Sequence, residues 1–538
     1  MGSLASAQTA DDPLAAVRKV VAEAALLTDA ASLALHSHDV LSRGAPPLAV
    51  FRPASVEELA AGIGAATAAG LAIVPRGGGM SYTGGYLYGG GRFLLIDTAA
   101  LDRIIAIDET DMVATVEAGI SWDALHRALA PRRLRVLAWG TLSGIRATVG
   151  GGMSQNGIFW GARGGSAVDS AVSFDVVLAD GTIISTGSAF FRPYGPDLTS
   201  LFAADCGAFG FKARVRLKLV REASAFAYGS FSFERHDGLL AAMSAIARAE
   251  LASESFAFDP FLQAQRMKRD SLIKDARQLG NMLKAEAKAG GIFKAMKEGA
   301  KVALAGRSFL DGVPFSLHCI AEGRHQGGVD ADMRAIEGIV REHGGSVVEN
   351  SIPKILRANP FPPPNSMLGP GGERWVPVHG FLPHSRLIEA WERLQALWDR
   401  NGADMARLKV ETGALIAATG RTSCLIEPVF FWPGEQNPLH AHAIEPDHLA
   451  RLPKLPDSPE ATALVERLKG EVIAIFQSLG AVHLQIARTY PLAARHDPAG
   501  WDILCALKRQ VDPRGLMNPG ALGLAPEPAR GPGDDAPD

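Results

Sequence analysis

One stretch of this chain has residues of a type and spacing that can hold an anion: Pro75–Gly85, with the sequence P-R-G-G-G-M-S-Y-T-G-G. Glycine tolerates a positive φ and has no Cβ, so consecutive backbone N–H groups of such a loop can turn toward one ligand. The apolar residues 71–74 predict a buried strand before the loop, and Ser55 with Glu58 predicts the start of a helix before that strand. This order favours a pyrophosphate ligand, although glycine clusters also form plain surface turns.

Two further segments give the glycine loop a context. Gly140–Gly157 reads G-T-L-S-G-I-R-A-T-V-G-G-G-M-S-Q-N-G and leads to Phe174–Gly181, F-D-V-V-L-A-D-G, while Val511–Gly520 reads V-D-P-R-G-L-M-N-P-G. With these segments in this order, the chain resembles the vanillyl-alcohol oxidase and p-cresol methylhydroxylase (PCMH) superfamily of flavoproteins. The matches are spread over most of the chain, which makes them more specific than a single glycine motif.

The resemblance implies an α+β fold. A PCMH-type FAD-binding domain of two α+β subdomains is joined in this superfamily to an α/β cap domain that binds the substrate. We expect the FAD-binding domain at residues 1–225 and the cap domain at 226–490. A C-terminal segment, 491–526, is expected to return to the FAD-binding domain, and the Pro-, Gly- and Asp-rich residues 527–538 to form a disordered tail.

The resemblance also implies which residues hold FAD. The two glycine segments would bind its pyrophosphate and ribityl chain, and Asn518 and Gly520 would close over it from the C-terminal segment. The predicted cofactor-binding residues are Pro75, Arg76, Gly77, Gly78, Gly79, Met80, Ser81, Gly84, Gly85, Gly140, Thr141, Thr148, Gly150, Gly151, Ser154, Asn156, Gly157, Gly161 and Asn518.

The branch of the superfamily that oxidises phenols binds a phenolate with two tyrosines and an arginine. Tyr82 and Arg488 match that pattern, and Tyr490 could replace the missing second tyrosine. Tyr82 could equally pack against the flavin edge, and His379 is either a core histidine or a contribution of the cap to the pocket. We therefore predict Tyr82, Arg488, Tyr490 and His379 as catalytic residues of an FAD-dependent oxidase or dehydrogenase. It would take hydride from a vanillyl-alcohol- or 4-alkylphenol-like substrate.

Two alternatives remain open. The D-lactate and glycolate dehydrogenase branch grips its substrate with a metal held by two histidines and a carboxylate. The nearest stretch here, Trp432–His440, has Trp432 in place of the first histidine, so we predict no metal and place His440 and His442 in a surface loop. A D-2-hydroxy-acid dehydrogenase that holds its substrate through Arg488 and passes electrons to a quinone or cytochrome is one alternative. A flavin electron-transfer subunit without a small substrate is the other.

Composition bounds the remaining properties. The 538 residues carry a net charge of -3, which gives no reason to expect nucleic acid as a partner. Four scattered cysteines and a start without a basic and apolar signal indicate a cytoplasmic protein. The basic segment 266–307 is expected to be a solvated helix, with a peripheral membrane or cytochrome contact as the alternative. A homodimer is a further alternative that the sequence leaves open.

We predict that FAD is bound without a covalent bond. Some branches tether flavin through a histidine in the glycine loop, where this chain has Met80, or through a cysteine in the second segment, where residues 138–157 contain none. Acid precipitation of the yellow protein is therefore expected to leave the flavin in the supernatant. Flavin that stays with the pellet would contradict this prediction. His379→Ala would then test the one candidate attachment site, because loss of that side chain should release the flavin.

Overall fold

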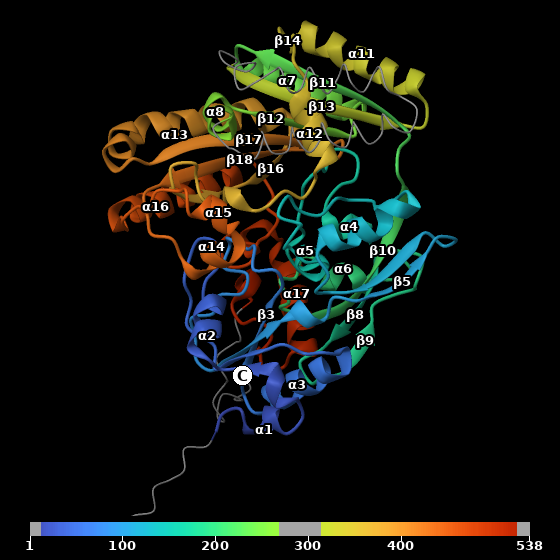
Figure 1. Cartoon of the computed structure of the whole chain (residues 1–538), viewed down its shortest axis with the longest axis vertical. Coiled ribbons are helices and arrows are strands. Elements are labelled where there is room, and N and C mark those ends of the chain that lie inside the picture. Colours follow the sequence, from blue (N-terminus) through green and yellow to red (C-terminus); the bar gives the residue numbers. More distant parts are fainter. Residues whose placement is uncertain (1–11, 268–313, 525–538) are drawn as a thin grey trace, which may run out of the picture.

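The computed structural model describes residues 12–267 and 314–524. From residue 268 on, the predicted basic segment lies outside these ranges, as does the predicted tail at 527–538. Three sheets organise these described residues (Figure 1), with the eight-stranded sheet at the top and the other two below it. This mixture of helices and sheets confirms the predicted α+β fold. Among the described residues, no helix combines the length and apolar character needed to cross a membrane.

The first sheet has four strands in the order β1-β2-β4-β3, and β2, β4 and β3 run parallel. Helix α3, Val56–Ala68, connects β2 to β3. The Ser55 hydroxyl accepts a hydrogen bond from Glu58 N at 3.1 Å, so the predicted helix start is confirmed. The strands are β1 (Leu26–Leu27), β2 (Ala49–Phe51), β3 (Ala72–Arg76) and β4 (Phe93–Asp97).

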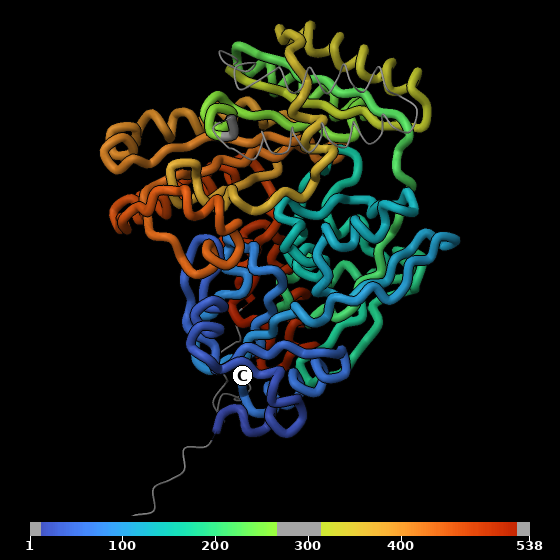
Figure 2. Tube along the Cα trace, in the orientation of Figure 1, coloured from blue at the N-terminus to red at the C-terminus, as the bar shows by residue number. Residues whose placement is uncertain are grey.

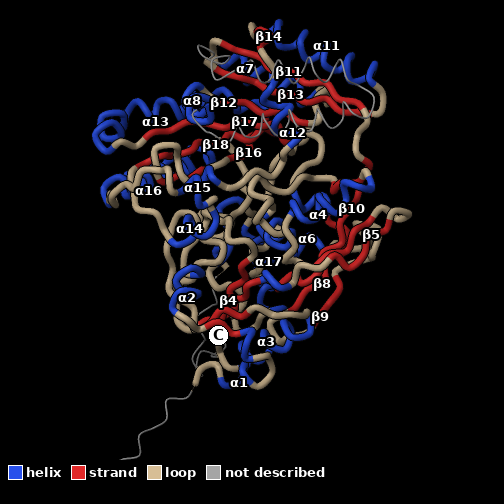
Figure 3. The backbone as a smooth tube through the Cα atoms, in the orientation of Figure 1, coloured by secondary structure: helices blue, strands red, loops and turns tan. Residues whose placement is uncertain are grey.

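The second sheet is antiparallel, in the order β5-β6-β10-β8-β9, and β7 also pairs with β10. Figure 3 shows its long strands beside the short helices α4 (Trp122–Leu129), α5 (Val149–Gln155) and α6 (Leu198–Phe202). The strands are β5 (Ile104–Asp108), β6 (Val113–Glu117), β7 (Leu134–Val136), β8 (Ala171–Val177), β9 (Ile183–Ser185) and β10 (Phe211–Arg221).

The third sheet is antiparallel, in the order β14-β11-β13-β12-β17-β18-β15, with β16 also paired to β18. Its strands are β11 (Ala225–Phe233), β12 (Glu254–Phe258), β13 (Phe315–Gly323), β14 (Ser346–Val348), β15 (Arg374–Pro377), β16 (Gly380–Pro383), β17 (Glu411–Thr419) and β18 (Ser423–Trp432). The chain leaves the ladder at Val378–His379, so β15 and β16 pair separately with β18.

The two faces of the third sheet pack against different partners, because side chains alternate along each strand. One face packs against four helices, through residues such as Leu317, Ile416 and Ile426. The opposite face, with Phe256 and Val429, joins the core of the second sheet. The helices are α7 (His236–Arg248), α11 (Gln326–Glu342), α13 (Leu387–Leu408) and α16 (Pro459–Ser478).

The C-terminal segment lies against the first sheet after helix α17, Pro498–Val511. Met517 forms a parallel bridge with Ile73 of β3, and Asn518 N donates to Ile73 O at 2.8 Å. Figure 2 shows the red C-terminal trace running among the blue and teal N-terminal elements. We keep a domain boundary near residue 225 as a proposal, since β10 of the second sheet ends at Arg221 and β11 of the third begins at Ala225.

A buried charge network joins the second and third sheets. The guanidinium of Arg357, on helix α12 (Ser351–Ala358), lies between the rings of Trp139, at 4.7 Å, and Phe226, at 5.1 Å. It forms an ion pair with Glu222 and lies 3.6 Å from Glu322. Arg135 Nη2 donates to Glu322 Oε1 at 2.6 Å. The network therefore fixes how the two sheets meet.

Arg357→Ala is expected to lower the free energy of unfolding by about 3 kcal/mol, because it removes one cation from the buried Glu322 and from the partly buried Glu222. Urea denaturation followed by far-UV circular dichroism measures the change. Arg341→Ala is the matched control, since Arg341 is exposed and lies 3.7 Å from Glu337 in a surface pair that contributes little. Equal stability of the two variants would show that the network is not a stabilising contact.

Candidate active site

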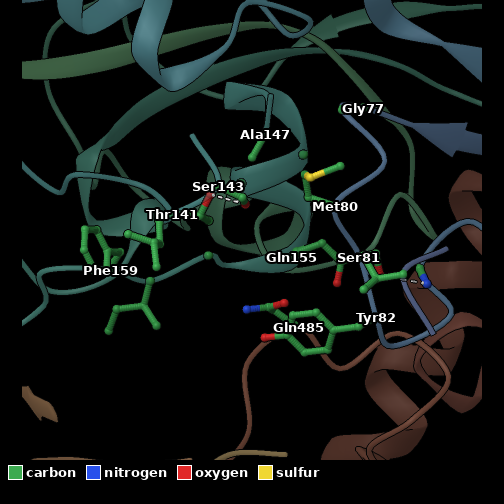
Figure 4. A pocket seen from close by; sticks show the side chains of 18 of the residues that line it. Gly77, Met80, Ser81, Tyr82, Thr141, Ser143, Ala147, Gln155, Phe159 and Gln485 are labelled. Atoms are coloured by element: carbon green, nitrogen blue, oxygen red, sulfur yellow. Dashed lines mark hydrogen bonds between the residues drawn. The ribbon is translucent and has the colours of Figure 1, made fainter. Parts of the chain in front are cut away.

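A cavity of about 310 Å³ lies between the two glycine segments and the third sheet. Figure 4 shows Met80, Ser81 and Tyr82 on one side, with Thr141, Ser143 and Gln155 from the second segment. Fifteen of the nineteen predicted cofactor-binding residues line this cavity: Pro75, Arg76, Gly77, Gly78, Gly79, Met80, Ser81, Gly85, Thr141, Thr148, Gly150, Gly151, Ser154, Gly157 and Gly161. The fold thus brings together two segments that are more than 50 residues apart in sequence.

Glycine is required where the two segments touch. A Cβ on Gly78 would overlap the carbonyl oxygen of Arg146, and a Cβ on Gly77 would overlap the hydroxyl of Thr148. Gly79 has a φ of +76°, which side-chain-bearing residues rarely adopt. The Thr148 hydroxyl caps helix α5 by accepting from Gly151 N at 3.1 Å. The glycine loop and the chain at residues 146–148 together form a cradle in which a ligand would meet backbone on both sides.

A buried cation lies at the glycine end of the cavity. Arg76 is only 6% exposed, and its Cζ lies 5.3 Å from the centre of the Tyr86 ring. Within the described residues, its buried Nε has no hydrogen-bond partner. A buried donor without a partner is costly, and a diphosphate supplies both the acceptor and the opposite charge. The cradle and this cation therefore fit the pyrophosphate of a dinucleotide.

Four predicted cofactor-binding residues are not among those that line the cavity, and they make contacts within the protein behind its walls. Asn518 Nδ2 donates to Gly85 O at 3.0 Å and to Cys206 O at 2.6 Å. Gly84 N donates to the carboxylate of the buried Asp39 at 3.0 Å. The others are Gly140, which has a φ of +86° and packs on Trp122, and Asn156, whose Oδ1 accepts from Val168 N at 3.3 Å.

Arg488 also occupies a place different from the one predicted. Its Nη1 donates to Gly84 O at 2.7 Å, and its Nη2 donates to Asn518 Oδ1 at 2.8 Å and to Pro519 O at 2.7 Å. It is not among the residues that line the cavity. The guanidinium thus binds the glycine loop to the C-terminal segment, because three acceptors surround it there.

Tyr490 lies one layer behind the cavity, whereas His379 lines it. The Tyr490 hydroxyl accepts from His379 N at 3.0 Å, and its ring stacks on His483 at 4.3 Å. Burial, with a smaller contribution from His483, lowers the pKa of His379 to about 3, so its imidazole is neutral at physiological pH. His379 therefore presents a neutral ring to the cavity, and Tyr490 positions it.

Tyr82 lines the cavity as predicted, with its ring edge-on to Trp375 at 5.9 Å. Burial, followed by the charge of Glu427, raises the pKa of Tyr82 well above its usual range, and a hydrogen bond with Gln485 offsets part of this shift. Its hydroxyl is therefore protonated at physiological pH. Figure 4 shows the side chain of Gln485 beside the Tyr82 ring.

The sequence prediction missed the acidic and amide residues of the cavity. Glu427 lines it from β18, between Leu425 and Val429, which line it too. An acid at the centre of an otherwise apolar strand was the available signal. Glu254, at the start of β12, is the second acid, and burial together with the charge of Glu322 raises its pKa well above the usual range.

The two histidines that follow Trp432, His440 and His442, differ in their exposure to solvent. His442 is exposed, as predicted, but His440 is fully buried, which corrects its assignment to a surface loop. His440 Nδ1 accepts from Asn437 N at 3.0 Å, and Asn437 Oδ1 accepts from His440 N at 3.0 Å. This reciprocal pair caps helix α14, Pro438–Ala443, so His440 serves the fold.

Comparisons with known proteins support FAD as the cofactor of this chain. The FAD binding domain family matches residues 47–187. The chain is 31% identical over 176 residues to the glycolate oxidase subunit GlcD of Bacillus subtilis, covering 32% of this chain and 37% of that protein. It is 31% identical over 241 residues to a probable mitochondrial D-lactate dehydrogenase of Danio rerio, covering 42% and 47%. The aligned parts thus span about a third to a half of these curated relatives.

Solved structures share the fold over nearly the whole chain. A p-cresol methylhydroxylase with bound substrate superimposes with a TM-score of 0.68 at 16% identity, covering 95% of this chain and 96% of that one. The 4-ethylphenol oxidase of Gulosibacter chungangensis, in complex with isoeugenol, gives a TM-score of 0.66 at 14% identity, covering 96% and 97%. The fold and the cradle define an FAD-binding flavoprotein. The chain thus carries an FAD binding domain at residues 47–187 and shares the fold of p-cresol methylhydroxylase and 4-ethylphenol oxidase.

Gly78→Ala is expected to lower the bound FAD at least about tenfold, because the added methyl group would force the glycine loop away from the Arg146 carbonyl. The ratio of flavin to protein absorbance in the purified variant measures this loss. Gly89→Ala is the matched control, since Gly89 is nearby in the chain and a Cβ there meets nothing within 4 Å. A Gly78→Ala protein with full flavin content would contradict the assignment of the cradle.

Proposed function

We propose that the protein is an FAD-dependent oxidoreductase that takes hydride from a small alcohol or phenol. The observation that carries this proposal is one cavity that extends from the glycine cradle to a polar group formed by Tyr82, Gln485 and His379. FAD, when bound, supplies the hydride acceptor. The chain's own residues position the substrate and exclude water from the cavity.

One set of residues would orient the substrate, and a second set would keep water away from it. The Tyr82 hydroxyl and the Gln485 amide can each donate or accept a hydrogen bond, so together they can orient a substrate hydroxyl. Around them, the side chains of Phe256, Leu415 and Leu425 give the cavity an apolar wall. A dry wall around a few fixed polar groups is the usual form of a small-molecule site.

A second candidate is a D-2-hydroxy-acid dehydrogenase that passes electrons to a quinone or cytochrome. It is favoured by the relatives, which are named as a glycolate oxidase subunit and a probable D-lactate dehydrogenase. The position of Arg488 weighs against it, because that guanidinium is bound to the glycine loop and the C-terminal segment. A flavin electron-transfer subunit without its own substrate is the third candidate.

Anaerobic bleaching of the flavin absorbance tests the three candidates. One panel holds vanillyl alcohol, 4-ethylphenol and eugenol, and the other holds D-lactate, glycolate and D-mandelate. We expect bleaching by the first panel, and Tyr82→Phe should raise the half-saturating concentration about tenfold through loss of one hydrogen bond, with unchanged flavin content.

Tyr194→Phe is the matched control, because Tyr194 is 78% exposed and lies outside the cavity lining. Bleaching by the hydroxy acids alone would favour the second candidate. Bleaching by neither panel, with flavin present, would favour the third. Equal kinetics of the two tyrosine variants would assign Tyr82 to packing.

A further inference from the structure

The loop between β9 and α6 exposes three aromatic side chains to solvent. Phe190 is 69% exposed, Phe191 58% and Tyr194 78%. We call residues 186–197 the aromatic loop, and none of them lines the cavity. Single exposed apolar residues are ordinary in soluble proteins, but these three rings lie close together in the chain and form a patch. Exposed apolar patches mark contacts with a partner or a membrane.

Arg192 anchors the aromatic loop to the rest of the protein. Its Nε donates to Asp197 Oδ2 at 3.0 Å, and its Nη1 donates to Val168 O at 3.1 Å. Its Nη2 donates to Ser200 Oγ at 2.8 Å, at the start of α6. Because these hydrogen bonds already fix the loop, it loses little conformational freedom when a partner covers its rings.

The surface of the aromatic loop carries no charge. All of its residues lie in the part of the chain that the structure describes, and none of the exposed ones is charged. Its two charged residues, Arg192 and Asp197, form an ion pair in which their side chains are 15% and 27% exposed. Charged side chains oppose entry into hydrocarbon, and here the two charges balance each other behind the rings.

The backbone of the aromatic loop offers few unpaired donors. Ser188 Oγ accepts from Phe191 N at 2.8 Å and donates to Phe191 O at 2.7 Å. Pro193 and Pro196 have no N–H group. A peptide group without a partner is costly in hydrocarbon, so this pairing lowers the cost of entering a lipid surface. The same pairing leaves little for a protein partner to bind by hydrogen bonds.

The patch is small for a protein interface. One aromatic side chain buries about 150–250 Å², so three rings that are each partly exposed offer on the order of 400 Å². A stable protein interface buries about 800 Å² on each partner. The aromatic loop therefore offers too little area to hold a second copy of this chain. Aromatic side chains are, in contrast, common where proteins meet the surface of a bilayer.

We propose that the aromatic loop is a membrane-contact site, which inserts Phe190, Phe191 and Tyr194 into the interfacial layer of a lipid bilayer. The two phenylalanine rings enter the acyl boundary, while the Tyr194 hydroxyl stays at the level of the headgroups. This attachment is peripheral and depends on burial of apolar area. A contact through the basic segment 266–307 would instead depend on anionic lipid.

Cosedimentation of the FAD-loaded, full-length protein with phosphatidylcholine vesicles tests the proposal. We expect the protein to bind, and a high salt concentration should change the partition coefficient less than about twofold, because salt screens charge and not apolar burial. The double variant Phe190→Ser and Phe191→Ser should lower the partition coefficient at least about tenfold. Its flavin content should equal that of the wild type, since both rings are exposed and outside the cavity lining.

Val347→Ser is the matched control, since Val347 is 57% exposed on β14, at the top of Figure 1 and away from β9. This variant should bind the vesicles as the wild type does. Absence of binding by the wild type would overturn the proposal, as would binding that needs anionic lipid and low salt. A double variant that binds like the wild type would also overturn it. Light scattering that shows a dimer only when the two phenylalanines are present would assign the aromatic loop to a second copy instead.

Discussion

The site depends on two stretches of backbone that approach more closely than side chains would allow. The loop at Gly77–Gly79 rests on the chain at Arg146–Thr148, and a Cβ on Gly77 or Gly78 would prevent this contact. The approach closes one end of the cavity and brings N–H groups of both segments to it. Because the first segment follows β3 of a parallel sheet and the second leads into α5 beside an antiparallel one, the contact also joins two sheets of different type.

Polar groups from three distant parts of the chain fix the loop in place. Asp39, near the N-terminus, accepts from Gly84 N, and Asn518 and Arg488 bind the carbonyls of Gly84 and Gly85 from the other side. Burial raises the pKa of Asp39 to about 6, although backbone N–H groups of Ser42, Gly84 and Leu41 favour its charged form. The loop is thus held by buried groups that have definite partners, which gives it one conformation.

The third sheet supplies one wall of the cavity. One face packs on helices through an apolar layer, while the other contributes Phe256, Leu425 and Val429 to the cavity. The acids on that face are Glu254 and Glu427, and burial, followed by the charge of Glu322, raises the pKa of Glu254 well above its usual range. Tyr82, Gln485 and a neutral His379 are further polar side chains that line this end of the cavity.

The sequence by itself determined the FAD cradle and the class of fold. Glycines at fixed spacing are needed where backbone meets backbone or a phosphate, and that requirement is local, so fifteen of the residues predicted from it line the cavity. Local patterns also predicted the capped helix α3 and the strand β3 that precedes the glycine loop. Only the tertiary structure decided which polar residues face the cavity. Arg488 has the right type and motif, yet acceptors from residues about 30 and 400 positions away surround it. The sequence prediction missed Glu427, because the alternation of side chains along a strand shows which residues share a face of the sheet. It does not show that this face lines a cavity.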